Sequence, residues 1–246
     1  MSNLKPINVY WAPMVDYDNG ESDMLYTEPQ NMFDYLTSLK SDISFKNTFF
    51  ACPAFTEKMK RTFFFTSPMS VSYEYHSIDG YMQIKPNDKS PSIGTSILRP
   101  ETLKDNPLFQ LNLFFSLFAE ESLETNFSAP YFHESKYTRY GSVCPGTFNI
   151  GKWFRPYPLE INMWNPKGKI SFEEGEPLFY VEFLTDRPIN IIRFKHTKDS
   201  SDYGKACAKS SEGIMKKFPL VKRYEIFKRT RIRELLLKEI KSNILD

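Results

Sequence analysis

The chain has no long apolar run and is poor in cysteine, glycine and histidine. No apolar stretch approaches the ~20 residues that a membrane-spanning helix needs, and the first residues lack the apolar core of a signal peptide. The cysteines Cys52, Cys144 and Cys207 are widely spaced and form no Cys-x-x-Cys pair. A secreted disulfide scaffold needs an even and denser set, so we expect reduced thiols in an intracellular protein without membrane partners.

Motifs that carry known chemistry are also missing. We find no glycine-rich phosphate loop and no signature of a serine or cysteine nucleophile. The histidines are His76, His133 and His196, and no two of them are close in sequence. These absences leave open whether the protein is an enzyme, and they favour the answer that it is not.

Aromatic residues and prolines are abundant. Phe, Tyr and Trp make up 16% of the 246 residues, and 17 prolines exceed 10 glycines. Aromatic side chains favour pleated, half-buried surfaces, and frequent prolines indicate short, sharply bounded segments. The length suits one sizeable domain, or one domain with an appendage.

Short apolar and aromatic runs alternate with turn residues along most of the chain. Asp79-Gly80 between two such runs predicts a β-hairpin, and residues 30–40 have the spacing of a short helix. Candidate strands cover residues 7–11, 49–50, 62–66, 71–75, 81–85, 109–117, 159–164, 169–172, 178–184 and 189–194. This pattern predicts a mainly β (α+β) fold, with a β-sandwich or jelly-roll-like domain over residues 1–197.

Residues 198–246 differ from the rest in charge. Residues 209–246 carry eleven Lys or Arg against five Asp or Glu, whereas the preceding residues carry 21 against 25. We predict a polar connection up to residue 213 and one basic amphipathic helix over roughly 220–242. Its apolar residues Leu220, Tyr224, Phe227 and Leu235 share one arc.

This predicted helix has two interpretations. Docking on the body or on another subunit is favoured, because acidic residues interrupt the basic ones. Nucleic-acid binding is the alternative, since phosphate contacts need such charges. The candidate nucleic-acid-binding residues are Lys228, Arg229, Arg231 and Arg233.

Residues 145–194 form the most distinctive stretch. Pro145–Pro156, Leu159–Trp164 and Phe172–Leu178 resemble a family of uncharacterised proteins from tailed phages and bacteria, and so do Cys52–Phe55 and Ala129–Tyr131. The likeness covers about residues 50–196. It implies a β-roll core and a phage origin, in the cytoplasm of an infected bacterium or in a virion, and it implies no activity.

A looser likeness concerns the order of strands and turns. Residues 145–179 are similar in this respect to the β-roll of deoxyuridine triphosphatases and deoxycytidine triphosphate deaminases. Those enzymes hold phosphates with an Arg-Ser-Ser element. The nearest segments, Phe127–Ala129 and Thr138–Tyr140, do not match it. The resemblance therefore implies a fold without the catalytic motifs.

Two sets of residues are candidates for a site. His133, Glu134 and His196 would supply the ligands of an Fe(II)-dependent oxygenase on a jelly-roll scaffold. His133 and Glu134 are sequence neighbours, however, and converge only at a bulge or turn, so we predict no bound metal or other cofactor. Trp153, Arg155 and Trp164 would form an aromatic binding platform, although most such aromatic residues belong to a core, and we expect both tryptophans to be mainly structural.

Three functions from different classes remain. A non-catalytic interaction or structural protein of a phage, with a protein partner or self-association, is favoured. A jelly-roll metal-dependent oxygenase-like enzyme and a nucleic-acid-associated protein acting through the C-terminal helix are the alternatives. Each alternative lacks an element that its chemistry requires.

Overall fold

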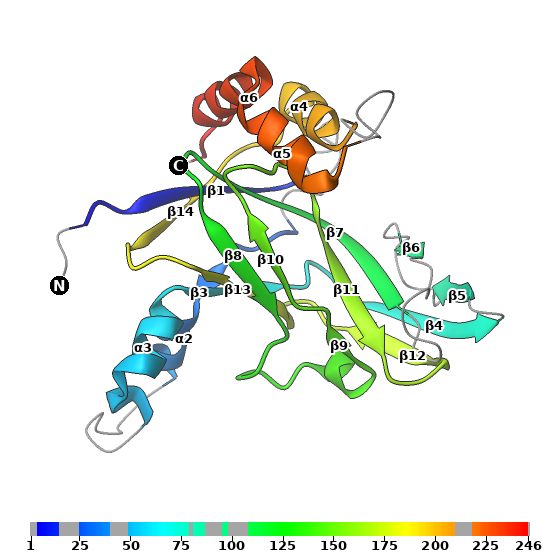
Figure 1. The fold of residues 1–246 in the computed structure, drawn as a ribbon. Coiled ribbons are helices and arrows are strands. Elements are labelled where there is room, and N and C mark those ends of the chain that lie inside the picture. Colours follow the sequence, from blue (N-terminus) through cyan, green and yellow to red (C-terminus); the bar gives the residue numbers. More distant parts are fainter. Residues whose placement is uncertain are drawn as a thin grey trace.

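The computed structural model describes residues 4–14, 25–39, 49–78, 81–86, 95–97, 108–209 and 218–245. These residues are mainly strands, which form three sheets, with helices at two places on their periphery (Figure 1). The prediction of a mainly β, α+β, sandwich-like fold is confirmed.

The described strands pair mostly antiparallel. The six-stranded sheet has the order β14 (Ile189–Arg193), β1 (Ile7–Pro13), β7 (Leu108–Ala119), β11 (Tyr157–Met163) and β9 (Gly141–Val143), with β6 (Thr95–Ile97) beside β7. The five-stranded sheet has the order β10 (Gly146–Asn149), β8 (Glu124–Ser128), β13 (Pro177–Phe183), β3 (Thr62–Thr66) and β2 (Gln30–Asn31). The three-stranded sheet consists of β12 (Lys167–Phe172), β4 (Val71–Ile78) and β5 (Tyr81–Pro86).

Aromatic side chains join the two larger sheets face to face. Phe115 of β7 contacts Phe65 of β3 and Phe179 of β13, with ring centroids 5.1 and 6.0 Å apart. Phe127 of β8 stacks on Tyr157 of β11 at 4.7 Å. This packing explains the high aromatic content, because large flat rings fill the space between two pleated surfaces.

Two groups of helices flank the sheets. The helices α2 (Met32–Ser38) and α3 (Pro53–Lys60) pack on β3. Short 3₁₀ turns lie at η2 (Phe49–Ala51) and η3 (Lys136–Arg139). The C-terminal helices α4 (Lys198–Lys209), α5 (Leu220–Lys228) and α6 (Arg231–Ser242) gather at the other end, beside β1 and β7 (Figure 1). No helix in these described ranges is long and apolar enough to cross a membrane.

Several predicted elements need correction. Phe49 and Phe50 lie in η2 rather than in a strand, and the sequence analysis missed α3, whose first turn begins with Pro53. Residues 198–209 are helical rather than a connection. Thr197 and Ser200 form a reciprocal capping box: the Ser200 amide donates to the Thr197 hydroxyl at 3.1 Å, and the Thr197 amide donates to the Ser200 hydroxyl at 2.9 Å.

The predicted single helix over 220–242 is also wrong, because it is divided at residues 229–230. Thr230 adopts an extended conformation and begins α6, and its hydroxyl donates to the Phe227 carbonyl at 2.8 Å. The break changes which residues face inward. Phe227 is buried as expected, but Leu235 is exposed and Leu236 is buried instead.

The C-terminal helices share the main core. Phe227, Leu236 and Ile240 belong to the same cluster of buried apolar residues as the two larger sheets. Side chains of these helices therefore pack directly against the sandwich. Their position places α5 beside the loop that joins β10 to β11, where the candidate site lies.

Candidate functional site

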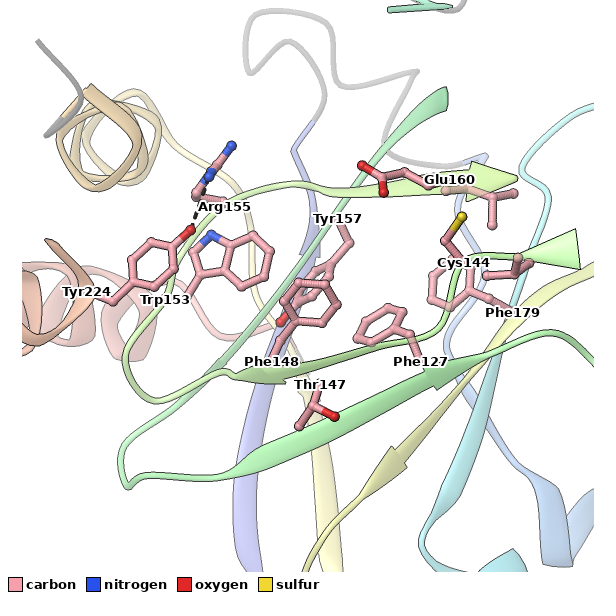
Figure 2. Close-up of a pocket in the computed structure, with 12 residues that line it drawn as sticks. Phe127, Cys144, Thr147, Phe148, Trp153, Arg155, Tyr157, Glu160, Phe179 and Tyr224 are labelled. Carbon is pink, nitrogen blue, oxygen red and sulfur yellow. Dashed lines mark hydrogen bonds between the residues drawn. The ribbon is translucent and has the colours of Figure 1, made fainter. Parts of the chain in front are cut away.

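A cavity of about 380 Å³ opens between the two larger sheets next to α5 (Figure 2). Strands β8, β9, β10, β11 and β13, the segments beside them and one residue of α5 supply its walls. The lining residues are Phe127, Val143, Cys144, Thr147, Phe148, Trp153, Arg155, Tyr157, Leu159, Glu160, Phe179 and Tyr224. Ligand sites in proteins are typically concave, mostly apolar, and furnished with a few polar groups, and this cavity has each of these properties.

Aromatic rings form a continuous wall inside the cavity. Phe127 stacks against Tyr157 on one side and against Phe179, at 5.3 Å, on the other. Phe148 lies 4.6 Å from Trp153, and Trp153 lies 5.0 Å from Tyr157. Each ring holds its neighbours in place, so the wall is set by packing before any ligand arrives.

Apart from Thr147, whose hydroxyl donates to the Asn126 Oδ1 atom at 2.6 Å, the polar groups of the cavity divide between its two ends. At one end the Arg155 guanidinium lies 5.5 Å from the centre of the Trp153 ring and donates to the Tyr224 hydroxyl at 3.1 Å (Figure 2). Tyr224 also stacks on Trp153, with centroids 5.6 Å apart and planes 17° from parallel. The three side chains therefore form one unit that joins α5 to the sandwich.

Cys144 and Glu160 lie at the other end of the cavity (Figure 2). Burial raises the pKa of the Glu160 carboxyl, since a charged carboxylate is costly in an apolar surrounding. Burial also raises the pKa of the Cys144 thiol, and the nearby Glu160 charge raises it further. Cys144 is thus held as a thiol, the form that is not nucleophilic.

Tyr157 lies at the centre of the aromatic wall. Its side chain is 3% exposed, and burial raises the pKa of its hydroxyl far above the ordinary value. Because the ionised form of Tyr157 is so strongly disfavoured, its side chain packs as a neutral group and does not serve as a base.

The three residues of the predicted aromatic platform separate in the structure. Trp153 is 6% exposed and joins Arg155 in the cavity, whereas Trp164 is 49% exposed and does not line it. The expectation that Trp164 is a buried structural residue is wrong. Trp164 follows the last residue of β11, and its amide donates to the Tyr140 carbonyl at 2.8 Å, so its backbone is held while its ring faces solvent.

The candidate metal ligands are not brought together. The Nδ1 atom of His133 lies 2.6 Å from the Tyr180 hydroxyl, and the imidazole contacts the rings of Tyr35 and Phe64, with centroids 4.7 and 4.8 Å away. Burial lowers the pKa of His133, which keeps the ring neutral. The adjacent Glu134 is exposed and pairs with Arg139 at 2.5 Å.

His196 belongs to a different motif. It precedes the capping box of α4, and its Nδ1 atom lies 2.7 Å from the Ser200 hydroxyl. Among the residues that the structure describes, no group of three or more His, Cys, Asp or Glu side chains is placed to hold a metal ion. His133 and His196 are thus parts of two separate packing arrangements.

The four basic residues of the predicted nucleic-acid arm have unequal surroundings. Lys228, Arg229 and Arg231 are exposed. Arg233 instead reaches into the body, where its Nε donates to the Gly151 carbonyl at 3.0 Å and its Nη2 to the Glu120 carbonyl at 2.5 Å. Arg233 thus differs from the other three candidates, because its position on α6 faces main-chain carbonyls of the sandwich.

Sequence analysis missed most of the cavity. Phe127, Phe148 and Tyr157 lie outside every predicted strand, although the structure places them in β8, β10 and β11, and Tyr224 is predicted only as an apolar position on a helix. The sequence signal for the cavity is the density of aromatic residues over 145–157, together with Arg155 in the same segment.

Comparisons of the chain with family models, with curated proteins and with solved structures find no match. The likenesses to the phage family and to the triphosphatase β-roll therefore stay predictions.

Proposed function

We propose that the protein is a non-catalytic interaction protein that binds a small ligand, or a small group carried by a partner, in the aromatic cavity. The observation that carries this proposal is the convergence of Trp153, Tyr224 and Arg155 at one end of a cavity of about 380 Å³ walled by stacked rings. A volume of this size lies within the range of about 300–1,000 Å³ that is usual for ligand pockets.

The non-catalytic part of the proposal has its own support. Cys144 is held as a thiol by burial and by Glu160, and His133 and His196 belong to separate packing arrangements. A general base needs to lie within hydrogen-bond reach of the proton that it takes. No described histidine lines the cavity. The phage context stays a prediction from the resemblance.

A cavity-filling variant tests the proposal. Val143 lines the cavity and is 6% exposed, so Val143→Phe places a ring inside it. Val221 on α5 is 73% exposed, and Val221→Phe is the matched control for the same change in chemistry. Both variants are checked for folding by circular dichroism, and a fragment set is then screened by saturation-transfer NMR.

We expect fragments to bind the parent protein and Val221→Phe but not Val143→Phe. Equal binding to folded Val143→Phe, or no fragment bound by the parent protein, contradicts the proposed function.

A further inference from the structure

Arg155 differs from the other half-buried arginines in the described part of the chain. Each of the others reaches a carboxylate or a main-chain carbonyl, which are the acceptors that a guanidinium prefers. Those pairs are Arg61 with Glu182, Arg187 with Glu121, Arg193 with the Tyr26 carbonyl, Arg223 with the Phe218 carbonyl, and Arg233 with the carbonyls of residues 119, 120 and 151. Arg155 has the neutral hydroxyl of Tyr224 as its hydrogen-bond acceptor.

A guanidinium carries five N–H donors, and one bond to a hydroxyl uses one of them. Within the described residues, no carboxylate pairs with Arg155. Leaving a partly buried cation without an anionic partner is unfavourable, so this end of the cavity is electrostatically incomplete.

A second donor without an acceptor lies at the same end. Trp153 is only 6% exposed, and its indole Nε1 has no hydrogen-bond partner among the described residues. Figure 2 shows the indole nitrogen on the side of the ring that faces Arg155. Buried donors in folded proteins are almost always paired, so an unpaired indole N–H beside a guanidinium that has no anionic partner favours a ligand that supplies an acceptor here.

The middle of the cavity is mainly apolar. Beyond Trp153 the walls are mostly rings and aliphatic side chains, with Thr147 among them, and the polar groups Cys144 and Glu160 lie at the far end. A ligand that matches both regions carries an acceptor-rich charged group at one end and a flat apolar body at the other.

We propose that the cavity binds a small organic anion, whose carboxylate or phosphate group pairs with Arg155 and the Trp153 indole N–H and whose ring body lies between the aromatic walls. This inference rests on the proposed function and adds the ligand class to it. The Tyr224 hydroxyl, which now accepts from Arg155, keeps the guanidinium aimed at the same place.

Probes that share one ring and differ in charge test the inference. They are 1-naphthoate, 1-naphthyl phosphate, neutral 1-naphthamide and cationic 1-naphthylmethylammonium, each titrated into the full chain by calorimetry. We expect one or both anions to bind at least about ten-fold more tightly than the amide, as expected for one added charge-assisted contact, and the cation to bind most weakly. The ratio between the two anions identifies which acid group the site prefers.

Two arginine variants locate the charge effect. Arg155→Gln should reduce the preference for the anion to about two-fold or less while the amide still binds, because the ring site is unchanged. Arg229→Gln removes an exposed arginine next to the end of α5 and should keep the full preference. The comparison of the probes in the parent protein needs no variant, so it decides the matter even if Arg155→Gln fails to fold.

The outcomes separate this inference from the proposed function. If the amide or the cation binds the parent protein as tightly as the anions, the ligand class is wrong and the proposed function stands. If folded Arg155→Gln keeps the ten-fold preference, the role of Arg155 is wrong. If none of the four probes binds, the ligand class is overturned, and the fragment screen with Val143→Phe decides the proposed function separately.

Discussion

Arg233 fixes the C-terminal helices to the sandwich, and its replacement should destabilise the whole protein. Its guanidinium donates to the carbonyls of Gly151, Ala119 and Glu120 at 3.0, 3.3 and 2.5 Å. It also lies 5.4 Å from the centre of the Phe118 ring. One side chain of α6 thereby contacts the end of β7 and the loop before β11.

The magnitude follows from these contacts. A hydrogen bond to a charged group contributes about 1.5–3 kcal/mol, and a cation–π contact about 0.5–1 kcal/mol at a site with solvent access. The contributions are not additive, because Arg233 is half-buried and water can replace part of each bond. We expect Arg233→Gln to lower the free energy of unfolding by about 2–4 kcal/mol, a large share of the 5–15 kcal/mol typical of a domain.

Urea unfolding followed by circular dichroism measures this loss. Arg231→Gln changes an exposed arginine two positions earlier on the same helix, and it should cost no more than about 0.5 kcal/mol. Arg233→Lys keeps the charge but not the fork of donors, so its loss should lie between the two. If Arg233→Gln and Arg231→Gln unfold at the same urea concentration with equal slopes, the docking argument is refuted.

Three further predictions concern single positions. An added Cβ at Gly151 would lie 2.0 Å from the Glu121 carbonyl oxygen, so Gly151→Ala should cost about 3 kcal/mol or more by urea unfolding; a change below 1 kcal/mol would mean that the backbone relaxes easily. Trp153→Ala should cost about 3–5 kcal/mol and Trp164→Ala about 0.5 kcal/mol, and thermal melts that reverse this order would contradict their assigned burial. Burial raises the pKa of Glu160 in the folded state, so the contribution of this residue to folding stability is most favourable at low pH and is lost as pH rises through that pKa. Glu160→Gln should therefore gain stability relative to the parent protein as pH increases from about 4 to 7. A stability difference that stays constant across thermal melts in this range would contradict the prediction.

The local pattern of the chain predicts most strands and little of their arrangement. The Asp79-Gly80 signal correctly predicts the hairpin of β4 and β5, in which Ile78 pairs with Tyr81. Nothing local indicates that β14 lies parallel to β1, where Ile7 pairs with Ile189 from a distant part of the chain. Such a pairing is stabilised by the whole sheet rather than by either segment, so single-sequence periodicity does not contain it.

Helices were missed where capping rather than apolar spacing defines them. The segment Lys198–Lys209 is polar enough to suggest a connection, but the side chains of Thr197 and Ser200 each accept a hydrogen bond from the other residue's amide and so cap its first turn. The division between α5 and α6 has a similar origin, since Thr230 turns its hydroxyl back to the Phe227 carbonyl. Both signals depend on one or two hydroxyl side chains, which become informative only when the neighbouring backbone is known.

The sequence predicts only part of the candidate site. The part that it does not predict is the contribution of α5 to the cavity. Trp153 and Arg155 are close in sequence and are predicted together as parts of an aromatic platform, whereas Tyr224 belongs to α5 and stacks on Trp153 only in the folded chain. The position of Tyr224 depends on the docking of α5 and α6, which Arg233 secures and to which the ion pair of Lys152 with Glu225, at 2.6 Å, adds a contact. Because the end of the cavity that carries the proposed anion site is completed by a helix from outside the sandwich, loosening that helix should weaken ligand binding as well as stability. The basic C-terminal region thus packs on the sandwich through its apolar and hydrogen-bonding side chains, and this packing completes the cavity.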